Sequence, residues 1–249
     1  MRFKTTPCAL RILWLALGIA TVGLVPASHA GPPLISDDPN TIGPGRAELI
    51  IAADVFDQGS LTTIAPTLDL TVGLVDRLDA TLVVTQGFDI DTRNPTRSSQ
   101  FVEAGIKWQS LNTRGFGASF SPAVGTSITE ETRAKIAFPL QLGYTGFEAL
   151  GFGVDAAIIV VPDSGDTWRA GGYATLQTSP TLTFLTEVWS QGMPSAGEAI
   201  AGVGGGFDWE TPLYVHILAA AGTGIASRNS QRVDWYSYLG LQWAFHAWQ

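Results

Sequence analysis

The sequence predicts an all-β protein, a membrane-spanning antiparallel up-and-down β-barrel, and three observations predict that class. Residues 1–30 have the basic start and apolar core of an export signal. Apolar and polar residues then alternate in short runs to the end of the chain, which is the period of a strand with two different faces. Tight turns alternate with longer polar loops between these runs, as in bacterial outer-membrane barrels.

The first 30 residues are expected to be a cleaved secretory signal. Basic residues precede an apolar run over residues 12–25, and Ser28 and Ala30 are small residues suited to a cleavage site. This run is too short and too interrupted by glycine and threonine to predict a transmembrane helix. Cys8 precedes the apolar run and leaves with the signal, so the mature chain is expected to lack any disulfide, thiolate metal site or cysteine nucleophile.

The remaining chain divides into a proline-rich extended segment, residues 31–45, and a barrel domain, residues 46–249. It carries 22 acidic and 11 basic residues, a balance that argues against nucleic-acid partners. Its longest apolar run, residues 156–161, has six residues. A membrane helix needs about 20, whereas a barrel wall needs only alternation.

About twelve strands follow from the alternation, and ten or fourteen remain compatible with it. An even number suits a closed barrel with both chain ends in the periplasm. The predicted strands are 47–56, 66–74, 78–86, 101–109, 116–125, 135–145, 150–161, 168–177, 182–189, 199–209, 213–221 and 233–245.

Aromatic residues gather near the predicted strand ends, as in the girdles of outer-membrane barrels. A soluble β-sandwich has the same period of two, but the export signal and the asymmetry of the loops favour the barrel. The girdle candidates are Trp108, Tyr144, Phe147, Trp209 and Trp243 at the tight turns, and Trp168, Trp189 and Trp235 at the long loops.

Charged residues on the barrel wall are expected to face the lumen, because Lys or Arg at the bilayer midplane costs about 2–4 kcal/mol. These side chains either contact solute or pair across a narrow lumen and plug it. Parity gives the candidates Asp69, Glu103, Lys107, Lys135, Asp155, Arg169, Tyr173, Glu187, Asp208, His216, Asp234 and Tyr236.

Glycines at 202, 204 and 206 share the lumen face, and so do Gly151 and Gly153. They predict either a groove for a flat apolar solute or, more simply, a bend or a close approach by the N-terminal segment. In that segment Asp37, Asp38 and Pro39 either enter the barrel as a plug or lie at its periplasmic rim. No transition-metal site is expected there, because no His or Cys accompanies the carboxylates.

The start GPPLISDDPNTIGPGRAEL resembles the "PPF-TDDP … G-x-E" opening of the MetA-pathway phenol-degradation family, through Asp37, Asp38, Pro39, Gly45 and Glu48. VGLVDRLDATL is similar to its "YGLTDRLEL" hairpin, EAGIKWQSL to its "LGLKYRF" strand, and residues 199–224 to its late hairpin. The resemblance implies a small outer-membrane transporter-like barrel, and the family name implies aromatic solutes.

The expected function is therefore an outer-membrane channel or transporter for small hydrophobic solutes, with outer-membrane lipid and solute as partners and no cofactor. A non-transport structural or adhesion barrel comes second. An acyl hydrolase comes third, because no Gly-x-Ser-x-Gly pattern surrounds His216 or His246, so no catalytic residue is assigned. Solute identity and oligomeric state stay open.

Overall fold

The computed structural model describes residues 35–91, 96–128, 134–162, 165–229 and 232–247. The predicted signal therefore lies outside the described residues. In this described part of the chain, thirteen strands form one antiparallel sheet. The first seven are β1 (Arg46–Asp57), β2 (Leu61–Val75), β3 (Leu78–Asp91), β4 (Arg97–Thr113), β5 (Phe116–Phe120), β6 (Ala123–Ser127) and β7 (Ala134–Tyr144). The remaining six are β8 (Leu150–Val160), β9 (Thr167–Ser179), β10 (Leu182–Met193), β11 (Glu198–Glu210), β12 (Val215–Arg228) and β13 (Trp235–His246).

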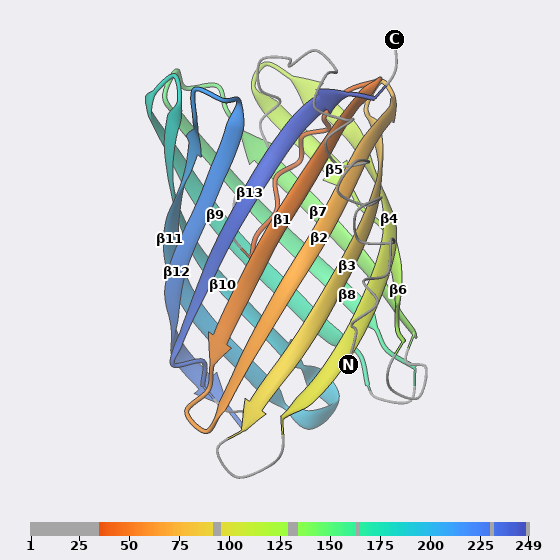
Figure 1. Ribbon diagram of the computed structural model, residues 1–249, viewed down its shortest axis with the longest axis vertical. Helices are drawn as coiled ribbons and strands as arrows, with labels where there is room; N and C mark the ends of the chain where they lie inside the picture. The colour runs from red at the N-terminus through yellow and green to blue at the C-terminus, as the bar shows by residue number, and fades with distance from the viewer. Residues whose placement is uncertain (1–34, 92–95, 129–133, 163–164, 230–231, 248–249) are drawn as a thin grey trace, which may run out of the picture.

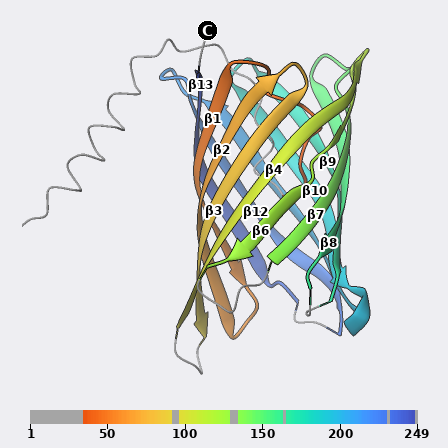
Figure 2. The ribbon, with the colours of Figure 1, turned by 90° about the vertical axis from the view of Figure 1, so that its right-hand side faces the viewer.

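Among the described residues the sheet closes into a barrel that is twelve strands around, when β5 and β6 are counted as one strand position. This confirms the predicted fold class. β1 pairs with β13 along its whole length, from Arg46 opposite His246 to Asp57 opposite Trp235, so this closure leaves no free edge. β5 and β6 occupy one strand position in the barrel, because both pair with β4 on one side and β7 on the other. Figure 2 shows this wall, with β4, β6 and β7 toward the viewer.

Ser121 and Pro122 separate β5 from β6 at this strand position. Proline has no N–H to give to a ladder, so a proline within a strand favours such a break. Two backbone bonds still cross the interruption, from Ile106 N to Pro122 O at 3.1 Å and from Ser121 N to Pro139 O at 3.0 Å. The sequence predicted one continuous strand over 116–125, and the structure corrects this to two short strands.

The two faces of the wall differ as the alternation predicts. Leu140, Ile158 and Leu239 point outward and are 50–62% exposed, as are many other large apolar side chains. Polar and charged residues such as Gln141 and Asp155 are buried on the inner face. An exposed apolar exterior of this kind suits lipid. Among the described residues no helix has the length and apolarity to cross a membrane.

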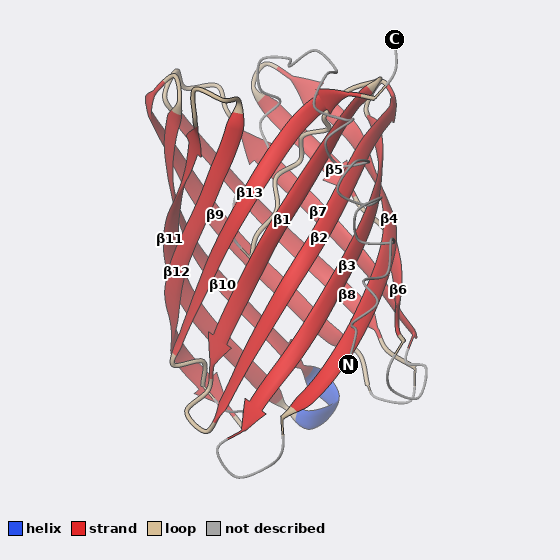
Figure 3. Ribbon diagram, viewed as in Figure 1, coloured by secondary structure: helices blue, strands red, loops and turns tan. Residues whose placement is uncertain are grey.

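The two ends of the barrel also differ. Tight connections, such as Asp76-Arg77 between β2 and β3, lie at the end where β1 begins and β13 ends (Figure 1, top). Arg77 and Arg114 have left-handed φ angles of 64° and 49° in two of these turns. The longer connections lie at the other end, and one contains the 3₁₀ turn Pro194–Ala196, the only helical element among the described residues (Figure 3). This loop asymmetry is typical of outer-membrane barrels, whose tight turns face the periplasm.

The N-terminal segment, residues 35–45, lies inside the barrel. Its red-orange trace lies behind β1 and β13 in the half nearer the tight turns (Figure 1). Of the two positions that the sequence left open for Asp37, Asp38 and Pro39, the structure has the plug.

Candidate functional site

The lumen and the N-terminal segment within it form the candidate site, and three charged side chains of the wall hold the segment. Lys107 on β4 donates from Nζ to Asp37 Oδ2 at 2.9 Å and to the Asp38 carbonyl at 3.0 Å. Glu187 on β10 accepts at Oε2 from the backbone N–H groups of Ile35, at 3.0 Å, and Ser36, at 3.2 Å. Charge-assisted bonds such as these are stronger than bonds between neutral groups.

A third anchor and several amides extend this hold toward the tight turns. Asp79 Oδ2 accepts from the Ile42 N–H at 2.9 Å, and the Gly73 carbonyl accepts from the Gly45 N–H at 3.0 Å. Gln109 Nε2 donates to Asn40 Oδ1 at 3.4 Å. These bonds satisfy backbone groups of an irregular segment inside a wall, which would otherwise carry a desolvation cost.

Wall glycines make room for the segment. A Cβ atom on Gly117 or on Gly143 would lie 2.9 Å from the Pro39 ring. A Cβ on Gly171 would overlap the Ser36 hydroxyl in the same way. The sequence predicts a close approach of this segment only at other glycines. The sequence feature that could have indicated this contact is the Asp37-Asp38-Pro39 motif together with glycines in the wall strands.

Most of the predicted lumen charges are paired. Lys135 Nζ contacts Glu103 Oε2 at 2.7 Å, and Arg169 contacts the buried Asp155 Oδ2 at 3.1 Å. His216 Nδ1 lies 2.7 Å from Asp208 Oδ1. Of the two outcomes expected for charges of the lumen, pairing is therefore the one observed for Lys107 and Arg169.

An aromatic cluster occupies the half of the lumen nearer the long loops. Trp189 and Tyr236 are buried, with ring centroids 5.9 Å apart, and Ile35 and Phe56 pack against them. The Tyr236 hydroxyl donates to Glu187 Oε1 at 2.7 Å. Glu187 is therefore a structural anchor rather than a solvated charge.

Two expectations for this region are corrected. Trp189 was assigned to the outer girdle, but it is 3% exposed and faces inward, because it shares parity with Leu185 and Glu187. Of the roles expected for the lumen glycines, a local bend is supported, because the register of β11 with β12 shifts between Ala201 and Gly202. Gly202 and Gly204 meet aromatic rings rather than a groove or the N-terminal segment. A Cβ on Gly202 would overlap Trp189, and one on Gly204 would overlap Tyr236.

The remaining candidates lie apart from one another. Tyr173 packs over Gly153 and lines a cavity near the tight turns, whereas Asp69 lines a cavity at the β1–β4 wall. Asp234 was predicted to lie on the last strand and face the lumen. The structure corrects this, because β13 begins at Trp235 and Asp234 is half exposed in the preceding loop, 3.6 Å from Arg232.

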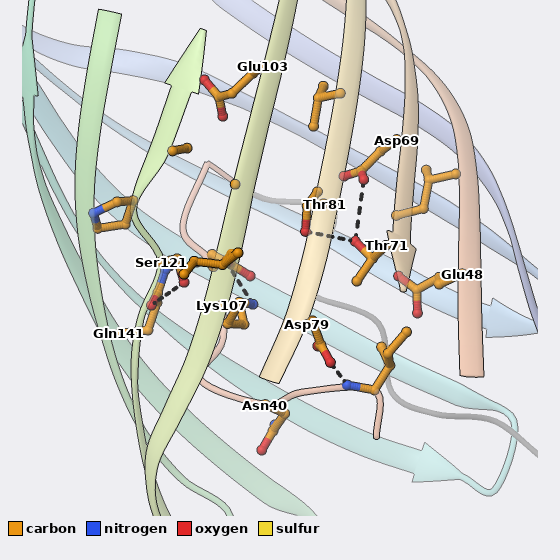
Figure 4. A pocket seen from close by; sticks show the side chains of 18 of the residues that line it. Asn40, Glu48, Asp69, Thr71, Asp79, Thr81, Glu103, Lys107, Ser121 and Gln141 are labelled. Carbon is orange, nitrogen blue, oxygen red and sulfur yellow. Dashed lines mark hydrogen bonds and ion pairs between the residues drawn. The ribbon is translucent and has the colours of Figure 1, made fainter. Parts of the chain in front are cut away.

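Several cavities adjoin the segment within the lumen. Two cavities of about 520 and 710 Å³ lie on the long-loop side and share Gln58, Arg169 and Gln191. A cavity of about 500 Å³ lies near the tight turns, and one of about 380 Å³, the lateral cavity, lies between the segment and β1–β7. Figure 4 shows the lateral cavity, with Glu48, Asp69, Asp79 and Lys107 around it. Volumes of this order can hold a small molecule.

Several inner-face residues were missed by the sequence analysis. Glu48, Asp79, Gln109 and Gln141 are buried polar side chains of the lumen, although none was named as a candidate. Strand parity would have found Gln109, because it shares the face of Lys107 on β4. Among the described residues no group of three or more His, Cys, Asp or Glu has a metal-binding arrangement.

Comparison with known proteins shows the fold. No family model and no curated protein sequence matches the chain. The chain is similar in structure to the COG4313 outer membrane channel from Pseudomonas putida F1, with a TM-score of 0.71 at 12% identity, covering 84% of this chain and 98% of that one. It is also similar to the KdgM porin, with a TM-score of 0.63 at 8% identity and coverage of 80% and 99%. NanC porin gives a TM-score of 0.56 at 10% identity and coverage of 80% and 98%. These similarities establish an outer-membrane β-barrel fold.

Proposed function

We propose that this protein is an outer-membrane channel for small hydrophobic solutes, with aromatic compounds as the preferred class. The observation that carries the proposal is the aromatic lining of the cavity of about 520 Å³ on the long-loop side. Phe56, Trp189, Tyr236 and Tyr238 all line it. Rings of this kind offer apolar area and edge or face contacts to another ring. Porins and channels are also among the similar folds, and the resemblance to the MetA-pathway family points to the same solute class.

The apolar exterior and the fold support residence in the outer membrane, with lipid around the wall. In this proposal the long-loop cavities receive solute from outside, and the N-terminal segment controls passage toward the tight turns. No catalytic step is part of the proposal. His216 is held by Asp208, and no serine hydroxyl among the described residues is hydrogen-bonded to it.

Uptake measurements test the solute class. Cells producing the protein should take up a radiolabelled neutral aromatic such as toluene faster than cells with an empty vector. Phe56→Ala should lower that rate, because Phe56 lines the long-loop cavity of about 520 Å³. Equal uptake by all three strains would refute the aromatic class.

The plug itself favours a second function, a non-transport structural barrel, because the segment crosses the lumen between the cavities. Planar-bilayer conductance separates the two functions. A channel should conduct in the parent or after Gly143→Val, which places side-chain atoms where Pro39 now lies. A protein that stays non-conducting in both forms, while it still folds and inserts, would support the structural barrel.

A further inference from the structure

The lateral cavity is lined by more carboxyl groups than cationic groups. Five carboxylates line it, from Asp37, Glu48, Asp69, Asp79 and Glu103, against the cations of Lys107 and Arg169. Lys107 is already bound to Asp37, and Arg169 to Asp155 outside this set. Glu103 takes its partner, Lys135, from β7. Among the described residues, Glu48, Asp69 and Asp79 therefore have no salt bridge of their own.

Two of these carboxylates also have an oxygen without a hydrogen-bond partner. Glu48 is 6% exposed, and its Oε2 has no partner among the described residues. Asp79 is 1% exposed, and its Oδ1 likewise has none. Asp69 accepts one long bond, at 3.5 Å, from the Thr71 hydroxyl. A buried carboxylate oxygen without a donor is costly, so a donor from outside the chain would be stabilising there.

Strand register brings Glu48 and Asp69 to one place. Glu48 on β1 lies opposite Thr71 on β2, and Asp69 is the next inward residue of β2. Diagonal neighbours of this kind have Cβ atoms about 7–8 Å apart, which leaves room for one small cationic group between their carboxylates. Figure 4 shows both carboxylates with Thr71 between them.

The other walls of the cavity are partly apolar. Ile50, Val83 and Tyr238 line it beside the two carboxylates. A volume of about 380 Å³ far exceeds one ion, and a water molecule takes about 30 Å³. The shape and chemistry therefore match a molecule with an apolar body and one charged nitrogen better than a bare metal ion.

We propose that the lateral cavity binds small primary amines in their ammonium form, with Glu48 and Asp69 accepting hydrogen bonds from the nitrogen and Ile50, Val83 and Tyr238 contacting the hydrocarbon body. This assignment rests on the proposed channel function only in supplying a route to the cavity. It adds amphiphilic amines to the hydrophobic solutes of the proposed function.

Equilibrium binding tests the proposal with two probes of one shape. 2-Phenylethylamine carries the ammonium, and 2-phenylethanol has a hydroxyl in its place. Titration calorimetry on the refolded full-length barrel in detergent at pH 7 should show binding of the amine at least about tenfold tighter than binding of the alcohol, as expected for hydrogen bonds between charged groups. Equal affinity for both probes, or no binding of the amine, would overturn the proposal.

Variants locate the site. Glu48→Gln and Asp69→Asn should each weaken amine binding by about tenfold or more. Asp76→Asn, which removes one charge from an exposed turn, should leave it unchanged. The heat-dependent gel shift of folded barrels checks each variant, and the amine should raise the thermal midpoint of the parent but not of a folded Glu48→Gln protein. Unchanged affinity in both lumen variants would refute the site. Amine binding without conductance or uptake would refute the channel and keep the site.

Discussion

Lys107 provides the sharpest test of the plug, because one side chain makes two contacts with the N-terminal segment. Its Nζ lies 2.9 Å from Asp37 Oδ2 and 3.0 Å from the Asp38 carbonyl. Lys107→Met keeps much of the side-chain length and removes both contacts. The anchors at Glu187 and Asp79 remain, so the segment should open more often without leaving permanently.

The magnitude follows from the contacts. A hydrogen bond to a charged group contributes about 1.5–3 kcal/mol. Asp37 is 37% exposed at its side chain and can be hydrated after the loss, so we take the value of one such bond rather than two. The ratio of open to closed segment should then rise by about 10- to 150-fold, since each 1.4 kcal/mol is a factor of ten.

Thiol labelling measures that ratio. Ser36 is 1% exposed, so Ser36→Cys, in a chain that also carries Cys8→Ser, should react with a maleimide only when the segment opens. With opening and closing faster than the reaction, the rate reports the open population. Lys107→Met should speed labelling by the factor above. Lys135→Met, which removes the partner of Glu103 instead, should leave the rate within about twofold. Equal rates in the parent and in Lys107→Met would show that the ion pair does not hold the plug.

Three further outcomes are expected. Leu140→Arg places a charge on the outward face, at a cost of about 2–4 kcal/mol at the bilayer midplane, so urea-induced unfolding in lipid vesicles should occur at lower urea. Thr71→Arg, on the lumen face, should shift the urea midpoint less, and equal shifts of the two midpoints would contradict the assigned faces. Gly143→Val should displace Pro39 and increase conductance while the heat-dependent gel shift persists, and an unchanged conductance would mean that the segment does not limit flow. Glu187→Gln should weaken the bonds to the Ile35 and Ser36 amides and speed maleimide labelling of Ser36→Cys by about tenfold, because a neutral acceptor binds amides less strongly than a carboxylate; a rate equal to that of the parent would assign the hold to other contacts.

The sequence alone was sufficient for the barrel and for the face of most residues. In a strand that separates lipid from lumen, apolar and polar residues must alternate. Runs such as Leu68 to Leu74 therefore predict both the strand and its two faces. The predicted number of about twelve strands matches the twelve strand positions of the barrel in the described residues. The contrast between tight and long connections is also present in the structure. The break at Ser121 and Pro122 was not predicted, because the alternation of inward and outward residues has the same parity in β5 and β6.

Only the tertiary structure decided which lumen groups meet. Parity places Lys107 in the lumen, but its partner, Asp37, is 70 residues away in sequence and lies outside the wall pattern. Glu187 likewise binds amides of residues 35 and 36, more than 150 positions earlier. Such contacts depend on the shear of the closed barrel and on the path of an irregular segment, and neither leaves a periodic signal in the chain. The glycines that face Pro39 and the unpartnered Oε2 of Glu48 became informative for the same reason, once the wall had closed around the N-terminal segment.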